Sequence, residues 1–371
     1  MNAGQRILFI SNTYMQLITA IQLKLSMFND AQADLILSDH SVNAHSIAKR
    51  LQTCGIFSRV HNVNSRKIMY EQGKLADLKD IMSVTFHFGK KFKSMLWQDT
   101  PYHAIFYYNL EPLLFCAYDE SVKNGVKPQC ICYEEGILSY ANIVYGYNVP
   151  HRMKAIHYLR GLLHKENISD LTKDFYIYYP ELFPNDRGVC HKIPHLSRED
   201  HIFIKTVNTI FDYHPEEEHY PQKYLFFASS ADIDGNPAGE TELVMRVSDI
   251  VGKENLLVKV HPRDSRHIYE EHGIAVSRNS AIPWEVIQLN HHFEDHVFLS
   301  VSSGSVLNAS AMLGDHIPTF YLYPLIKGKN TFVDRYCEQN VEKNVCALQK
   351  AGVLQETRIV NNLREICAGT S

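Results

Sequence analysis

The sequence predicts an α/β protein of two lobes, each built on a parallel sheet covered by helices. Short runs rich in β-branched and aromatic residues alternate with helical stretches, which is the pattern of parallel sheets. The chain has 371 residues, more than one hydrophobic core usually holds. A polar, proline-bearing linker at about 185–221 interrupts the alternation. We therefore expect an amino-terminal lobe at 1–200, a carboxy-terminal lobe at 221–371 and a cleft between them.

Seven runs are expected to be strands. They lie at 6–11, 34–38, 102–108 and 129–133 in the first lobe, and at 223–228, 255–260 and 296–301 in the second. After the first run, Ser11, Asn12 and Thr13 can cap a helix, and apolar residues then recur at near-helical spacing up to Leu25. A second helical stretch is expected after Ser305.

The composition excludes several classes of protein. A net charge of −4 with 21% charged residues gives no sign of a nucleic-acid-binding surface. No apolar run approaches the ~20 residues that span a bilayer, and the first residues lack the apolar core of a secretory signal, so we expect a cytoplasmic protein. None of the eight cysteines belongs to a C-x-x-C pair, and we expect reduced, mostly buried thiols.

The sequence contains neither a G-x-G-x-x-G nor a G-x-x-x-x-G-K fingerprint. Two Rossmann-like lobes without these motifs favour a nucleotide-sugar enzyme of the GT-B architecture over a dehydrogenase or a P-loop enzyme.

An acidic pair is the first candidate for catalysis. Glu134, Glu135 and Gly136 directly follow the run 129–133, and ligands of parallel α/β sheets bind beyond the carboxyl ends of strands. Adjacent carboxylates that face a pocket raise each other's proton affinity, which suits a general base. A solvated turn is the alternative, and the pattern alone gives the two about equal weight.

A histidine motif and a serine loop are candidates for phosphate binding. His261 and Pro262 follow an apolar run, where an imidazole can donate a proton or a hydrogen bond to phosphate. Ser302, Ser303 and Gly304 lie between an expected strand and an expected helix, where backbone N–H groups can bind an anion. Plain helix capping by serine is the commoner alternative.

Glu285 lies between these two motifs. Its carboxylate can accept hydrogen bonds from ribose hydroxyls, or it is an ordinary glutamate at a helix start.

No metal site is expected. Asp232 and Asp234 match a D-x-D pattern but are followed by Gly, Asn and Pro, which favours a turn. His292 and His296 are four residues apart but lack the H-E-x-x-H sequence and a third ligand.

A basic amphipathic segment at 152–165 offers a peripheral contact with an anionic membrane, with Lys90, Lys91 and Lys93 assisting. Its positive charges come from Arg152, Lys154, Arg160 and Lys165. A helix packed on its own core is the commoner alternative.

The order of these motifs resembles that of the bacterial sialyltransferases, which include the lipooligosaccharide enzymes of glycosyltransferase family 52 and the capsule polysialyltransferases. The resemblance rests on Glu134-Glu135-Gly136, then His261-Pro262, then Ser302-Ser303, with Glu285 similar in placement to a ribose-binding glutamate. The opening stretch at 9–17 also resembles family 52, and the two glutamates are nearer the polysialyltransferases.

The resemblance implies a GT-B fold and transfer of sialic acid from CMP-sialic acid, with inversion and without an essential metal or other cofactor. The acceptor would be a galactose- or sialic-acid-terminated glycan of a surface polysaccharide or lipooligosaccharide, with Asn12, Thr13 and Gly136 on the acceptor side. His261 and the serine loop would stabilise the departing CMP phosphate. Glu134 is expected to be the base and Glu135 to brace the loop, because adjacent side chains of an extended chain point to opposite faces.

Two alternatives remain at this stage. One is a metal-independent GT-B transferase of another acidic sugar, such as Kdo. The other is a non-catalytic protein of polysaccharide assembly that binds a nucleotide or a glycan. The oligomeric state is open, a homodimer included.

Overall fold

The computed structural model consists of two compact units, and each is described by itself. Unit 1 contains Met1–Glu135 and Ile143–Ile193, and unit 2 contains Gly136–Asn142 and Pro194–Ser371. The structure describes residues 5–38, 43–64, 96–97, 100–140, 151–163, 165–183, 188–231, 233, 235–261, 263–277, 279 and 282–368.

Unit 1 is built on a parallel sheet with the strand order β3-β2-β1-β4-β5-β6-β7. The strands are β1 Arg6–Ser11, β2 Gln32–Ser38, β3 Arg59–Val63, β4 Ala104–Tyr107, β5 Gln129–Tyr133, β6 Asp174–Ile177 and β7 Val189–Lys192. The central strands β1 and β4 are wholly apolar and buried apart from their ends, as expected for strands covered on both faces.

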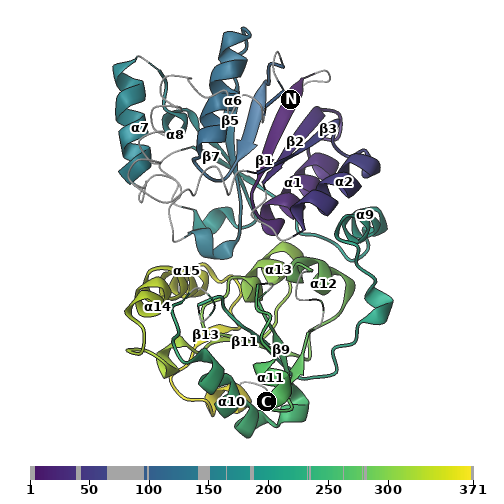
Figure 1. Ribbon diagram of the computed structural model, residues 1–371, viewed down its shortest axis with the longest axis vertical. Helices are drawn as coiled ribbons and strands as arrows, with labels where there is room; N and C mark the ends of the chain where they lie inside the picture. Colours follow the sequence, from purple (N-terminus) through teal and green to yellow (C-terminus); the bar gives the residue numbers. More distant parts are fainter. Residues whose placement is uncertain are drawn as a thin grey trace. The chain divides into compact units, whose positions relative to one another are not determined.

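Helices cover both faces of this sheet (Figure 1). They are α1 Tyr14–Ser26, α2 Ala44–Cys54, α6 Pro112–Lys123, α7 His151–Leu162 and α8 Ile168–Leu171. The helix α1 begins where the side chain of Thr13 accepts a hydrogen bond from the backbone N–H of Gln16, as expected for a threonine N-cap.

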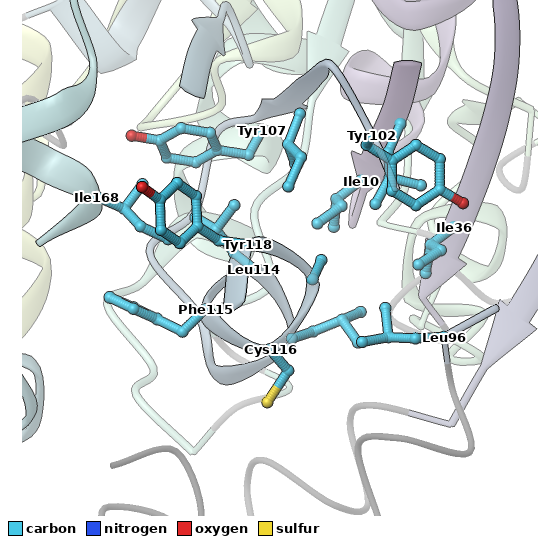
Figure 2. Close-up of a cluster of buried hydrophobic side chains, with 14 of the residues drawn as sticks. Ile10, Ile36, Leu96, Tyr102, Tyr107, Leu114, Phe115, Cys116, Tyr118 and Ile168 are labelled. Atoms are coloured by element: carbon cyan, nitrogen blue, oxygen red, sulfur yellow. The ribbon is translucent and has the colours of Figure 1, made fainter. Parts of the chain in front are cut away.

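One core cluster of unit 1 lies between α6 and the central strands. Figure 2 shows Leu114 and Phe115 of α6 facing Tyr107 of β4 and Ile10 of β1. All four side chains are at most 4% exposed. This packing fixes the strand ends from which the polar groups described below project.

Unit 2 is built on a second parallel sheet with the strand order β10-β9-β8-β11-β12-β13. The strands are β8 Tyr224–Phe227, β9 Leu256–Lys259, β10 Ala275–Val276, β11 Val297–Ser300, β12 Thr319–Tyr321 and β13 Thr357–Ile359. The helices are α9 His201–Phe211, α10 Glu240–Val251, α11 Ile268–Glu271, α12 Trp284–Asn290, α13 Ser305–Leu313, α14 Thr331–Tyr336, α15 Lys343–Ala351 and α16 Glu365–Ala368. A short 3₁₀ helix, η1 Ile137–Tyr140, also belongs to this unit.

Both sheets reverse their direction of growth at one point. The reversal falls between β1 and β4 in unit 1, and between β8 and β11 in unit 2. In open parallel sheets, ligands bind outside the carboxyl ends of the strands at this switch point. The residues after these strands are therefore the first place to look for a site in each unit.

Two sequence-based expectations differ from the structure. The stretch 185–221 was expected as a linker, but it contains β7 and α9. The side chain of Asp200 caps the first turn of α9 by accepting a hydrogen bond from the N–H of Phe203. The segment Gly136–Asn142 was expected in the amino-terminal lobe, but it belongs to unit 2.

The expected basic amphipathic segment forms α7, but Arg160 does not contribute charge to its surface. Arg160 is fully buried and forms a bidentate pair with Asp119 at 2.8 Å, and Lys165 contacts the same carboxylate at 3.2 Å. Burial of the guanidinium requires such a partner. Leu162 and Leu163 are exposed, while Lys90, Lys91 and Lys93 lie outside the described residues, so a membrane contact stays a prediction.

Candidate active site

Glu134 lies inside unit 1. Its backbone N–H donates to the carbonyl of Tyr176 at 3.0 Å, which extends the pairing of β5 with β6, and its Oε2 accepts from the N–H of Tyr178 at 2.8 Å. The side chain has no exposed surface. Glu134 therefore ties the end of β5 to the end of β6.

Glu135, the next residue, is partly exposed, unlike Glu134. Burial raises the pKa of its carboxyl to about 7, and the nearby polar side chains of Gln16 and Thr13, at the start of α1, act in the other direction. A carboxyl with this pKa is divided between its acidic and basic forms near neutral pH, which is the property of an effective general base.

Asn12 and Glu111 lie at the switch point between β1 and β4. The Asn12 side chain donates from Nδ2 to Oε1 of Glu111 at 3.3 Å, and its backbone N–H donates to Oε1 of Gln16 at 2.6 Å. Glu111 is 4% exposed, and burial raises its pKa to about 7. Glu111 was not predicted from the sequence. Like the acidic pair, it is an acidic residue that follows a β-rich run, four residues after the end of β4.

In unit 2, His261 lies two residues after β9. It is half-buried, and its Nδ1 accepts a hydrogen bond from the backbone N–H of Arg263 at 3.2 Å. Pro262 lies outside the described residues.

Two buried charged side chains of this unit, Lys259 and Glu285, interact electrostatically. Lys259, the last residue of β9, is 8% exposed and donates from Nζ to the carbonyl of Ile282 at 3.2 Å. Burial lowers the pKa of Lys259 to about 8, and burial raises the pKa of Glu285, while the opposite charge of each partner acts against these shifts. Glu285 is 7% exposed, in the first turn of α12.

The serine loop connects β11 to α13, as the sequence predicted. The N–H of Ser303 donates to Oγ of Ser300 at 2.9 Å, and the N–H of Ser305 donates to Oγ of Ser303 at 3.3 Å. Two N–H groups of the loop are therefore bound by its own hydroxyls. Ser302 and Gly304 are half-buried, and Ser302 Oγ and the remaining N–H groups are the groups that an anion can meet.

The sequence patterns predicted no metal site. Among the described residues, no group of three or more His, Cys, Asp or Glu side chains is arranged to hold a metal ion. His292 contacts Glu294 at 3.2 Å, and His296 contacts the carbonyl of Tyr220 at 2.9 Å. Asp232 and Asp234 lie outside the described residues.

Comparison with known proteins identifies the fold. No protein-family model and no curated protein sequence matches the chain. An alpha/beta-galactoside alpha-2,3-sialyltransferase from Photobacterium phosphoreum has a similar structure, with a TM-score of 0.53 and 10% identity over 98% of this chain and 99% of that chain. The protein has the GT-B fold.

Two other similar structures show that this fold serves different activities. LpCGTa, in complex with UDP, has a TM-score of 0.53 and 11% identity over 99% of this chain and 89% of that chain. A UDP-GlcNAc 2-epimerase from Methanocaldococcus jannaschii has a TM-score of 0.50 and 10% identity over 98% and 91%. At such identities the likeness defines the fold, so the activity must be argued from the residues.

In the part of the chain that the structure describes, no helix is both long and apolar enough to cross a bilayer.

Proposed function

We propose that the protein is an inverting glycosyltransferase that moves sialic acid from CMP-sialic acid to a hydroxyl of a glycan, with Glu135 as the general base. The observation that carries the proposal is the position of Glu135, a partly exposed residue that follows the end of β5 at the ligand-binding edge of the sheet, and burial raises the pKa of its carboxyl to about 7. It stands where GT-B-type sheets bind ligands and where the sialyltransferase-like acidic motif falls.

The burial of the two glutamates favours this assignment over the sequence-based choice of Glu134. A base must reach the acceptor hydroxyl within hydrogen-bond distance. Glu134 has no exposed surface and binds the N–H of Tyr178, so it suits the bracing role that the sequence analysis gave to Glu135. The identity of the base stays a prediction that the variants discussed below test.

The donor is assigned to unit 2. His261 follows β9, Glu285 is in the first turn of α12, and the loop of Ser302 and Ser303 follows β11. These positions lie at the ligand-binding edge of the sheet. His261 and the loop offer N–H and O–H donors to a phosphate, and Glu285 offers a carboxylate to ribose hydroxyls. The proposal adopts CMP because the order of these motifs resembles that of the bacterial sialyltransferases.

The reaction balances with these groups. The acceptor oxygen forms a bond to the anomeric carbon of sialic acid as the bond from that carbon to the phosphate oxygen of CMP breaks. Glu135 takes the proton of the acceptor hydroxyl, and CMP leaves with the electron pair. His261 and the serine loop stabilise the charge on the departing phosphate by hydrogen bonds.

One experiment tests the proposal against its alternatives. The protein is incubated with CMP-sialic acid and labelled galactosides and sialosides, and thermal shifts with CMP, CDP, UDP and GDP are measured in parallel. We expect transfer to a galactose- or sialic-acid-terminated acceptor and a shift with CMP. Transfer from CMP-Kdo alone would indicate another acidic sugar, a shift with UDP alone would exclude the CMP donor, and CMP binding without transfer or hydrolysis would indicate a non-catalytic protein.

The proposed mechanism uses no metal. Transfer should therefore continue in excess EDTA, whereas loss of transfer with rescue by magnesium or manganese would contradict this part of the proposal.

A further inference from the structure

A groove of about 400 Å³ lies on unit 2, between α10 and the turn that follows β13. Arg246, Asp249 and Ile250 line it from α10, where spacings of three and four residues place them on one face of the helix. The residues 361–364 line it from the turn, and Leu325 completes the lining. The volume is that of a pocket for a small molecule, and none of these residues belongs to the groups proposed to bind the donor.

Both arginines of the groove are available to a ligand. In the part of the chain that the structure describes, the side chains of Arg246 and Arg364 have no hydrogen bond or ion pair with another residue. Asp249 is the acidic residue of the lining, so two positive charges face one negative charge and the groove favours an anion. Elsewhere in the described residues, five arginines each bind a carboxylate: Arg6, Arg59, Arg160, Arg198 and Arg266.

The turn that presents Arg364 is ordered by its own hydrogen bonds. Oε1 of Glu365 accepts from the backbone N–H of Asn361 at 3.2 Å and from that of Asn362 at 2.8 Å. Oδ1 of Asn362 accepts from the backbone N–H of Arg364 at 3.0 Å. A ligand therefore meets a backbone that is already in place, which lowers the entropic cost of binding.

The lining offers three kinds of contact. A guanidinium group binds a carboxylate through paired N–H donors. The side chains of Asn361 and Asn362 are exposed, and their amides can form hydrogen bonds with hydroxyl groups. Leu363 is 6% exposed, Leu325 is half-buried and Ile250 is 43% exposed, so an apolar surface lies beside the polar groups. A sugar ring that bears hydroxyls and a carboxylate matches all three.

We propose that this groove is a second binding site of the protein, for a carboxylated sugar unit of an acidic glycan. The arginines bind the carboxylate, the asparagines bind hydroxyls, and the leucines pack against a face of the ring. The site is additional to the donor and base sites of the proposed function, and its existence does not depend on them.

Hydrogen exchange on the full chain locates the binding, with sialic acid as the probe. Excess sialic acid should slow exchange at 243–251 and at 357–366, the two segments that line the groove. The methyl ester of sialic acid keeps the ring and its hydroxyls but lacks the charge, and it should change neither segment.

Two variants and a matched control test the arginines. Arg246→Gln and Arg364→Gln should each weaken the binding of sialic acid by about tenfold or more, the scale of one charge-assisted hydrogen bond. Arg358→Gln removes the same charge from an exposed residue of β13 that does not line the groove, and affinity should stay within about twofold of the parent. All three side chains are exposed, so Tm should be unchanged.

The outcomes separate this proposal from the proposed function. No protection at either segment, or an equal loss of affinity in Arg358→Gln, would overturn the site. Inorganic phosphate that protects both segments at the same concentration would show a general anion site and overturn the assignment to a sugar. Protection of the groove without transfer from CMP-sialic acid would contradict the proposed function alone, whereas transfer without protection would contradict the groove alone.

Discussion

Replacing Glu135 by glutamine removes the proposed base while keeping its size. A positioned general base contributes about 10²–10⁴-fold to rate, so Glu135→Gln should lower turnover by at least about 10²-fold. Affinity for CMP should change little, because the base acts on the acceptor. The matched control is Glu134→Gln, whose amide oxygen can still accept from the N–H of Tyr178 and which should keep most of the turnover.

The expected pH dependence of turnover follows from the pKa of Glu135. With a pKa of about 7, the carboxyl of Glu135 is fully ionised well above neutral pH, and turnover should be constant there. Below the pKa, turnover should fall about tenfold for each pH unit, to about a hundredth of its plateau at pH 5. A glutamate with an ordinary pKa would give a constant turnover down to about pH 5.

The assay is single-turnover transfer with saturating donor, from pH 5 to pH 9, on the parent and both glutamine variants at matched Tm. A dead Glu134→Gln beside an active Glu135→Gln would reverse the assignment. An active Glu135→Gln variant with the parent's pH profile would remove Glu135 from the chemistry.

Three further predictions concern stability and the leaving group. Because the pKa of Glu111 stands at about 7 instead of 4.5, the folded state holds this proton more tightly than the unfolded state, and its stability falls as pH rises through that interval. Glu111→Gln should thus raise the free energy of unfolding by up to about 3 kcal/mol at pH 8 but by little at pH 4, and equal urea midpoint shifts at both pH values would contradict this. Arg160→Ala should cost about 3 kcal/mol, because Lys165 still faces Asp119, while Lys165→Ala should cost under about 1 kcal/mol; equal losses in urea unfolding would contradict burial of the pair. His261→Ala should lower turnover by about 10²-fold or more at unchanged Tm, and turnover within a factor of two of the parent would exclude it.

The strands that the sequence predicted are those with continuous apolar runs. Gln129–Tyr133 and Arg6–Ser11 were predicted to the residue, because central parallel strands are buried on both faces. The edge strand Val189–Lys192 was missed, since it is half-buried or exposed and carries no such run. Strands of three residues, such as Thr319–Tyr321, are too short to show a hydrophobic periodicity in the sequence.

The candidate site could be predicted only to the level of position along the chain. Strand ends indicated Glu134, Glu135 and His261, and the alternation of side chains indicated that the two glutamates face opposite ways. Which face is open depends on how α1 packs against the sheet, and that is determined by residues distant in the sequence.

The chain passes between the two units three times, after Glu135, after Asn142 and after Ile193. A single cut therefore cannot yield two independent lobes. A fragment ending at Ile193 would retain η1 but lack α13 and α15, against which η1 packs, so the buried Ile137 and Tyr140 would become exposed to water. A fragment starting at Pro194 would instead leave the surface that η1 covers exposed. Grafting unit 2, to which the donor is proposed to bind, onto another enzyme would require transplanting residues 136–142 together with residues 194–371, as two pieces of one unit.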